Sequence, residues 1–380
     1  MNNLSNKKYL IFVNEFFGEW DTAKGGYGFL ARHILPKALN IPISNLTVCL
    51  GRSHSLYKCE TRCSSEGIKL LKLPKLRFLA AKIVNSYDVL ITIEATVDYL
   101  FSLKNRLDKK ILFWIQDPRP CEDWDIINSV TLAKEENYYN SKTYELVNYC
   151  YKQNLLYFAT QANYLSQKAV KLYKLDPSIS IPFLPNPIEA QPDYSSKENN
   201  IIFLGRLDSV KRGWLFCEIA KQLPNYNFYV LGSSSNDLER QNNSILDKYK
   251  NLPNLHFLGH LDGEEKAREL RKAKILVNTS IHEALPISFL EAFAYGATVV
   301  SNQNPDNLVQ TYGRYIGEST GNGWEDVQKF VTEITFLLSN DEIRSDLASK
   351  AKKYLIRYHS LENFRKQLNL ILDAMQSSNI

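Results

Sequence analysis

The chain has 380 residues, of which 44% are hydrophobic and 23% are charged, and 46 Lys and Arg against 41 Asp and Glu leave a net charge of +5. This composition excludes a disordered or fibrous chain, and the length exceeds the ~250 to 300 residues at which single cores divide, so we expect two folded domains. The mild positive charge suits phosphate-bearing ligands. The sequence lacks the concentrated basic face of nucleic-acid binders, so we expect no nucleic acid partner.

No segment has the pattern of a secretion signal or a membrane span. Asn14 and Glu15 interrupt the first apolar run, and no later stretch reaches ~18 uninterrupted apolar residues. We therefore expect a cytoplasmic protein. Residues 168–175 (KAVKLYKL) leave contact with the cytoplasmic face of a membrane open, because they form either a basic surface that touches anionic lipid or a solvated helix face beside the core.

Apolar runs alternate with helical patterns along the whole chain, which predicts an α/β protein with two parallel sheets covered by helices on both faces. In the first half, the expected strands are the runs KYLIFVN, NLTVCL, YDVLITIE, KKILFWIQ and NLLYFAT. In the second half, the runs IIFLG, NFYVLG, LHFLG, KILVNTS and ATVVSN repeat this pattern. We expect one domain to form around each set of strands.

A proline-rich, polar stretch at residues 181–200 separates the two sets of strands and is the expected linker, because prolines cannot continue a buried sheet. We accordingly predict a first domain over residues 1–191 and a second over residues 192–358. The last segment, residues 359–380, has helical periodicity. Its apolar residues at one helical face are Leu361, Phe364, Leu368 and Ile371.

The segment ILVNTSIHEALPISFLEAFAYG carries the clearest chemical signal. Glu283 lies between the end of an expected strand and a helix that Pro286 begins, and ligands of parallel sheets bind at this edge. The amides of Ile287 and Ser288 at the helix start would suit a diphosphate. Glu291 could accept hydrogen bonds from ribose hydroxyls. The alternative is that both glutamates are solvated residues near the positive end of the helix dipole.

A second segment, IIFLGRLDSVKRGWLF, places Arg206 and Lys211 in the loop after another strand of the same domain. Two cations at this position could neutralise a diphosphate and stabilise it as it departs in a transfer reaction. The alternative is a solvated basic turn, to which Arg212 would belong.

Taken in order, GRLDSVKR, NLHFLGHL and EALPISFLEAFAYG resemble the C-terminal domain of glycosyltransferase family 4 (group 1), with two glutamates eight positions apart in the family's motif. The resemblance implies the GT-B architecture, two Rossmann-like domains across a cleft, and a retaining transferase without an essential metal or other cofactor. It implies that Arg206 and Lys211 bind the donor diphosphate, Glu283 the transferred sugar and Glu291 the ribose. The chain around Gly259 to Leu261 would border the base, mostly through backbone, and the final helix would return to the first domain.

The first domain matches the family less closely. In AKGGYGFLAR, the glycines would let backbone amides approach a phosphate, and the family's glycine loop assigns Gly26 to the donor, although a tight turn fits equally well. In ILFWIQDPRP, Gln116 stands where many members have a histidine, and glutamine cannot exchange protons near neutral pH. We assign Gln116, Asp117 and Arg119 to the acceptor side, with Asp117 orienting the acceptor hydroxyl.

These assignments predict transfer of a hexosyl group from a UDP- or GDP-linked sugar to a hydroxyl of a sugar, glycan or lipid-linked acceptor. The triplet Asp123-Trp124-Asp125 matches the metal motif of the other major transferase architecture, GT-A, but the two-sheet pattern favours GT-B. Two alternatives stay open: a nucleotide-sugar epimerase, and a non-catalytic GT-B protein that binds a sugar nucleotide as a partner subunit. No pattern identifies the sugar, the acceptor or the oligomeric state.

Overall fold

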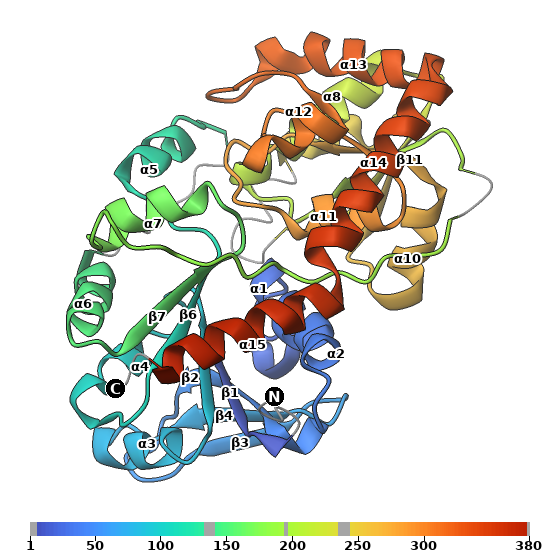
Figure 1. Ribbon diagram of the computed structural model, residues 1–380. Helices are drawn as coiled ribbons and strands as arrows, with labels where there is room; N and C mark the ends of the chain where they lie inside the picture. Colours follow the sequence, from blue (N-terminus) through green and yellow to red (C-terminus); the bar gives the residue numbers. More distant parts are fainter. Residues whose placement is uncertain (1–5, 133–140, 194–196, 235–243, 378–380) are drawn as a thin grey trace. The chain divides into compact units, whose positions relative to one another are not determined.

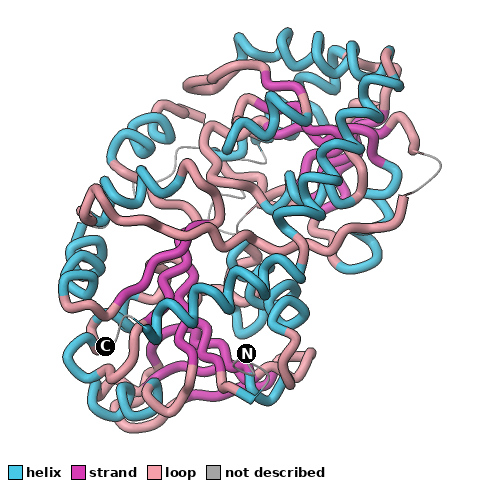
Figure 2. The backbone as a smooth tube through the Cα atoms, viewed as in Figure 1, coloured by secondary structure: helices cyan, strands magenta, loops and turns pink. Residues whose placement is uncertain are grey.

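The computed structural model describes residues 6–132, 141–193, 197–234 and 244–377. The chain divides into two compact units. The N-terminal unit comprises residues 1–120, 139–187 and 361–380, and the C-terminal unit comprises residues 121–138 and 188–360. Each unit is a parallel or mostly parallel sheet flanked by helices, as the colouring by secondary structure shows (Figure 2).

The N-terminal unit is built on a seven-stranded sheet in the order β3-β4-β2-β1-β5-β6-β7. All neighbouring strands are parallel except β3, which pairs antiparallel with β4. The strands are β1 (Tyr9–Phe12), β2 (Leu46–Arg52), β3 (Glu60–Cys63), β4 (Lys69–Leu73), β5 (Val89–Ile93), β6 (Ile111–Ile115) and β7 (Leu156–Thr160).

Helices cover this sheet: α1 (Gly26–Phe29), a π-helical turn (Leu30–Ile34), α2 (Leu35–Leu39), α3 (Arg77–Val84), α4 (Asp98–Phe101), α6 (Ser141–Lys152), α7 (Leu165–Tyr173) and α15 (Leu361–Ser377). The final helix α15, red in Figure 1, lies beside α2, and Arg365 Nε donates to the Ala38 carbonyl at 2.8 Å. Phe364 packs on Trp114 of β6 with ring centroids 5.5 Å apart. The apolar face expected for this helix is therefore buried in the N-terminal unit.

The C-terminal unit has a six-stranded parallel sheet in the order β10-β9-β8-β11-β12-β13. Its strands are β8 (Asn200–Leu204), β9 (Asn227–Leu231), β10 (Leu255–Gly259), β11 (Ala273–Asn278), β12 (Thr298–Ser301) and β13 (Arg314–Tyr315). Its helices are α5 (Cys121–Asn128), α8 (Gly213–Gln222), α10 (Gly263–Lys272), α11 (Ile287–Ala294), α12 (Leu308–Tyr312), α13 (Val327–Ser339) and α14 (Asp341–His359).

All ten runs predicted as strands form strands, which confirms the α/β fold class with two parallel-dominated sheets. The sequence analysis missed β3, β4 and β13. Three of the four residues of β3 are exposed, so its sequence lacks an apolar pattern, and β13 has only two residues.

The division between the units differs from the predicted domains in three places, the last of which is the start of the final segment, at residue 361 instead of 359. The chain passes into the C-terminal unit after Pro187, four residues before the predicted boundary, and residues 121–138 also belong to that unit. Helix α5 explains the second difference, because Trp124 and Ile127 are buried in the same apolar cluster as Trp214 of α8. Asn322 Oδ1 also accepts the backbone amide of Thr131 at 3.0 Å.

Within the described part of the chain, no helix is long and apolar enough to cross a membrane. The apolar face of α7 packs inside the N-terminal unit, where Leu165, Ala169 and Leu172 are buried. The apolar side of this amphipathic helix is therefore part of the core of the N-terminal unit.

Candidate active site

The predicted donor residues gather at the carboxyl ends of β8 and β11, which are neighbouring strands of the C-terminal sheet. Glu283 follows β11, and its Oε1 accepts a hydrogen bond from Lys211 Nζ at 2.5 Å. Lys211 ends a short 3-10 turn (Ser209–Lys211) after β8. The structure therefore brings together two residues that are 72 positions apart in the chain and that the sequence analysis assigned to the same site.

Glu283 is held in place by two further donors. Asn278 Nδ2 and Ser280 Oγ donate to the same Oε1 at 3.0 and 2.6 Å. Burial alone would raise the pKa of this carboxyl, but the positive charge of Lys211 and the three hydrogen bonds together lower it. Glu283 is therefore an ionised carboxylate at neutral pH, and it cannot serve as a general acid there.

Arg206 lies at the surface of this edge, with half of its side chain exposed, and its Nε is 3.2 Å from Asp208 Oδ2. Close by, the backbone of β8 and β9 makes a tight approach at Gly232, where a Cβ would lie 1.8 Å from the Gly205 carbonyl oxygen. Only glycine fits there, since its φ of 153° and this contact both exclude a side chain. At this edge of the C-terminal sheet, the accessible guanidinium of Arg206 therefore lies near the closely packed backbone of Gly205 and Gly232.

Arg212 is not part of a solvated basic turn, and the alternative offered for this loop is wrong for that residue. Its side chain is fully buried, and its guanidinium donates to the carbonyls of Thr279 and Gly321 at 2.7 and 3.2 Å and to Ser319 Oγ at 2.9 Å. Burial lowers its pKa to about 10, which still leaves it charged at neutral pH. Arg212 therefore anchors the loop that carries Glu283.

Ile287 and Ser288 begin α11, and no side chain caps the N-terminus of this helix at Pro286. Its first amides and the positive end of its dipole are available to an anion. Glu291 lies one turn further along and is 9% exposed. Its Oε1 pairs with Lys266 Nζ of α10 at 2.8 Å.

Leu261 follows β10 after Gly259, whose φ is 70°, and Leu261 is partly exposed. The acceptor-side residues lie instead at the carboxyl edge of the N-terminal sheet. Gln116 directly follows β6, and the Oδ2 atom of Asp117 accepts hydrogen bonds from Arg119 Nε and Nη2 at 2.9 and 2.7 Å. The paired side chains stay partly exposed, 15% for Asp117 and 29% for Arg119.

Gln116 is buried in an amide network rather than directed to solvent. Its Oε1 accepts from Asn186 Nδ2 at 2.9 Å, and its backbone carbonyl accepts from Gln161 Nε2 at 2.6 Å. All three side chains are at most 3% exposed. Gln116 is therefore placed to hold the ends of β6 and β7 together.

The glycine-rich loop around Gly26 is arranged around a carboxylate of the protein itself. Glu15 accepts hydrogen bonds from the amides of Gly25 and Gly28 at 3.2 and 2.9 Å. A Cβ at Gly25 would lie 2.4 Å from Glu15 Oε1, and one at Gly28 would lie 2.5 Å from the Phe17 amide nitrogen. These two glycines are thus required by local packing, while Gly26 itself is exposed.

Several residues that shape the two sites were not predicted. Glu94 directly follows the predicted strand β5 at the same edge as Asp117, so a carboxyl group at a strand end was the available signal. Asn278 and Ser280 lie inside the motif that was found. Lys266 gave no signal, because its pairing with Glu291 depends on how α10 packs against α11.

The triplet Asp123-Trp124-Asp125 lies on helix α5, where residues two positions apart do not face each other. Asp123 is buried with its Oδ2 4.0 Å from His282 Nδ1, whereas Asp125 is exposed. Among the residues that the structure describes, no three His, Cys, Asp or Glu side chains gather as metal ligands would.

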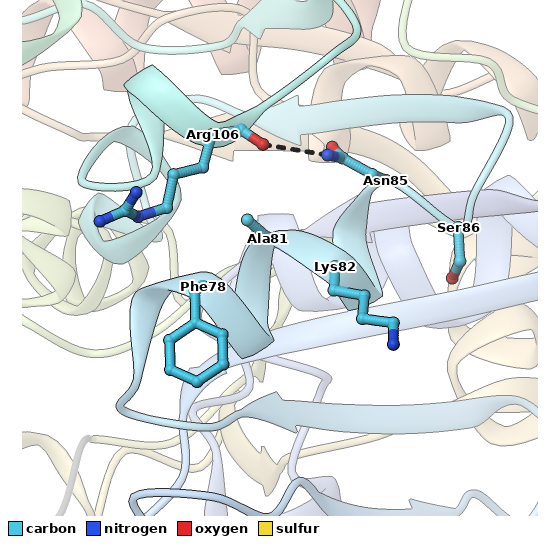
Figure 3. Close-up of a pocket in the computed structure, with 6 residues that line it drawn as sticks. All are labelled: Phe78, Ala81, Lys82, Asn85, Ser86 and Arg106. Carbon is cyan, nitrogen blue, oxygen red and sulfur yellow. Dashed lines mark hydrogen bonds between the residues drawn. The ribbon is translucent and has the colours of Figure 1, made fainter.

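An open hollow of about 490 Å³ lies elsewhere, between α3 and a short turn at Lys104–Arg106 (Figure 3). Its lining includes Phe78, Lys82 and Arg106, and Asn85 Nδ2 donates to the Arg106 carbonyl at 3.0 Å. These segments lead into the amino ends of β5 and β6. The hollow is therefore at the sheet edge opposite the candidate site and is no part of it.

Two Rossmann-like units, each a parallel or mostly parallel sheet flanked by helices, define the GT-B fold. Comparisons with known proteins agree. Residues 187–354 match the family of glycosyl transferases group 1. No curated protein matches the sequence.

Solved structures with the same fold cover nearly the whole chain at low sequence identity. Anabaena HepE matches with a TM-score of 0.71 and 11% identity over 97% of this chain and 100% of its own. The sucrose-phosphate synthase of Thermosynechococcus elongatus matches with a TM-score of 0.71 and 12% identity over 98% and 100%. A glycosyltransferase of Rickettsia africae matches with a TM-score of 0.61 and 15% identity over 97% and 98%.

Residues 187–354 therefore match the family of glycosyl transferases group 1, and the chain has the GT-B fold of these solved structures.

Proposed function

We propose that the protein transfers a hexosyl group from a nucleoside diphosphate sugar to an acceptor hydroxyl, with retention of anomeric configuration and without an essential metal. The observation that carries this proposal is the Lys211–Glu283 pair beside the uncapped start of α11. UDP is the first donor nucleotide to test, with GDP as the alternative. Structures of HepE hold UDP, UDP-glucose, or UDP with glucose, and a pneumococcal O-GlcNAc transferase holds UDP and GlcNAc.

In the proposed complex, Lys211, Arg206 and the amides of Ile287 and Ser288 bind the diphosphate. An incoming diphosphate competes with Glu283 for the Lys211 ammonium group, which releases the Glu283 carboxylate toward the sugar. Glu291 accepts hydrogen bonds from the ribose hydroxyls, and the chain near Leu261 borders the base. This arrangement uses Arg206, Lys211, Glu283 and Glu291, the four residues that the family resemblance assigns to the donor.

The proposed reaction breaks the bond between the anomeric carbon and the phosphate oxygen and forms a bond from that carbon to the acceptor oxygen. Negative charge grows on the diphosphate, where Lys211, Arg206 and the α11 dipole stabilise it. The departing phosphate oxygen takes the proton of the acceptor hydroxyl. A front-face route of this kind needs no protein base, in keeping with a glutamine at position 116 and an Asp117 already paired with Arg119.

On the acceptor side, we assign Asp117 to orient the acceptor hydroxyl and Arg119 to hold Asp117 and contact the acceptor. The acceptor classes to be tested are free sugars, glycans and lipid-linked glycosides. Gln116 is held in the amide network and its own side chain is not titratable, so it does not deprotonate the hydroxyl.

The test is incubation of the protein with UDP- and GDP-hexoses and an acceptor panel, with and without EDTA, and with NMR assignment of the product anomer. Acceptor-dependent release of the nucleotide with retention and no loss in EDTA supports the proposal. Conversion of the donor sugar without an acceptor would identify an epimerase instead. Donor binding without turnover on any acceptor would identify a non-catalytic binding protein.

A further inference from the structure

We propose that Glu94 is a positioning residue of the acceptor side: its buried carboxyl fixes the backbone at Gln116 and Asp117 and thereby sets the direction of the Asp117 carboxylate. This inference rests on the proposed function, which assigns Asp117 to the acceptor hydroxyl. Glu94 lies outside the site that the sequence motifs define, and its role requires no contact with either substrate.

The geometry around Glu94 links two neighbouring strand ends and the end of helix α7. Its Oε2 accepts the backbone amide of Gln116 at 2.7 Å and that of Asp117 at 2.9 Å. Its Oε1 accepts a hydrogen bond from the Tyr173 hydroxyl at the end of α7. Its own amide donates to the Trp114 carbonyl in β6 at 3.0 Å. One carboxyl group therefore ties the exit of β5 to the exit of β6.

The backbone at Glu94 has a φ of 53°, in the left-handed region that side chains other than glycine and asparagine seldom adopt. Holding a glutamate there costs conformational energy, and such strain concentrates where function fixes a geometry. Here the conformation brings the carboxyl group under two consecutive amides of the next loop. A glycine would remove the strain but also both hydrogen bonds.

Burial separates the roles of the two acidic residues. Glu94 is 8% exposed, and its partners account for both of its carboxyl oxygens. Asp117 keeps 15% of its side chain exposed beside Arg119. Asp117 can therefore meet an acceptor, whereas Glu94 acts only through the backbone that it holds.

Tyr27, the residue after Gly26, belongs to the same cluster. Burial raises the pKa of its phenol, the negative charges of Asp117 and Glu94 raise it further, and Arg119 lowers it. Tyr27 is therefore within electrostatic range of these three groups. The glycine-rich loop and the exits of β5 and β6 therefore meet around Asp117 within the N-terminal unit.

The test combines amide hydrogen exchange with kinetics on the full chain for Glu94→Leu, Glu94→Gln and Tyr173→Phe. Leucine removes both acceptor oxygens, so the peptide spanning residues 111–120 should exchange faster, and the KM for the acceptor should rise about tenfold or more. Glutamine keeps one oxygen for both amides and should restore slow exchange and most of the acceptor affinity. Tyr173→Phe leaves in place the two hydrogen bonds that the amides of Gln116 and Asp117 donate to Glu94, so it should have the smallest effect.

The affinity for UDP separates positioning from general stability. The Kd for UDP should stay within about twofold of wild type in all three variants, because the donor residues lie in the other unit. Unchanged exchange of residues 111–120 in Glu94→Leu would overturn the proposal. Weaker UDP binding in parallel with a raised KM for the acceptor would also overturn it. If Glu94→Leu does not fold, Glu94→Gln provides the test. Wild-type amide exchange and acceptor KM in Glu94→Gln would support the proposal, and faster exchange together with a raised acceptor KM would contradict it.

A wild-type protein that binds UDP but transfers to no acceptor would count against the proposed function. The exchange comparison would still support or overturn the anchoring of residues 116 and 117 by Glu94, so the two failures are distinguishable.

Discussion

The carboxyl edges of the two sheets use acidic residues in opposite ways. At the C-terminal edge, each glutamate of the motif faces a lysine, at 2.5 Å for Glu283 and Lys211 and at 2.8 Å for Glu291 and Lys266. At the N-terminal edge, Asp117 also faces a cation, Arg119, but the carboxyl groups of Glu15 and Glu94 bind backbone amides.

The C-terminal edge is therefore suited to exchanging one anion for another, whereas Glu15 and Glu94 at the N-terminal edge fix the shape of their loops. A lysine paired with a carboxylate can change partner when a diphosphate arrives, because both anions satisfy the same charge. A carboxyl group that binds backbone amides, as Glu94 binds those of Gln116 and Asp117, fixes the shape of the loop itself. The first arrangement suits a charged donor, and the second suits recognition of a neutral hydroxyl by a preformed loop.

The largest expected effect comes from a substitution that breaks the ion pair between Lys211 and Glu283. Glu283→Ala should lower turnover about 10²- to 10³-fold, because it removes a group that acts near the reacting carbon, while UDP affinity changes less than about threefold. Steady-state rates and calorimetric Kd values measure both. Glu342→Ala, at an exposed position of α14, is the control. Equal losses in turnover and UDP binding would mean that Glu283 only binds the nucleotide.

A second change removes the anchor beneath the donor loop. Arg212→Met should lower the free energy of unfolding by about 3 kcal/mol, because it leaves buried carbonyls of the Glu283 loop without a donor. Denaturant unfolding measures this. The exposed Lys221→Met serves as a control and should change stability by less than about 0.5 kcal/mol. A comparable loss in both variants would contradict the anchoring role of Arg212.

Glu291 gives a smaller effect that depends on the nucleotide. Glu291→Ala should weaken UDP binding about tenfold, or about 1.4 kcal/mol, by removing the acceptor for the ribose hydroxyls. Binding of 2′,3′-dideoxy-UDP should change little. Lys266→Met, which removes the partner of Glu291, should shift UDP affinity in the same direction. An equal loss for both nucleotides would place Glu291 away from the ribose.

The smallest effects concern pH, and they have opposite signs at the two edges. The pKa of Glu283 is lowered from its ordinary value of 4.5, so its contribution to stability is present above pH 4.5 and is lost as the pH falls through the folded-state pKa. The pKa of Glu94 is raised by burial, despite its hydrogen bonds, so its contribution is present below pH 4.5 and is lost as the pH rises through the folded-state pKa.

Unfolding free energies of wild type, Glu283→Gln and Glu94→Gln across this pH range test those signs. Glu283→Gln should flatten the decrease on the acid side, and Glu94→Gln should flatten the decrease above pH 4.5. The same pH response in both variants would remove the contrast between the two edges.

The donor edge could be predicted because its residues follow strands with strong apolar patterns and share a local motif. Glu283 and Lys211 were both assigned to one site before any contact was known. The buried role of Arg212 could not be predicted, because the sequence does not show which of two adjacent cations turns inward. That choice follows from the left-handed backbone at Arg212 and from the carbonyls of the loops packed above it.

The acceptor edge was harder to predict because its organisation depends on contacts between segments far apart in sequence. Glu94 and Tyr173 are 79 residues apart, and only the packing of α7 brings them together. Helix α5 illustrates the same limit. The sequence does not show that its Trp124 is buried with the core of the C-terminal unit.

The central claim is that the carboxyl edge of the C-terminal sheet binds a nucleoside diphosphate through its cations. Calorimetric titration of the wild-type protein with UDP, GDP and ADP, repeated on Arg206→Ala, Lys211→Ala and the control Lys221→Ala, tests it most directly. We predict selective binding of one nucleotide, UDP first, that both site variants lose and the control keeps. Absence of binding by the wild type, or unchanged affinity in both site variants, would contradict the account.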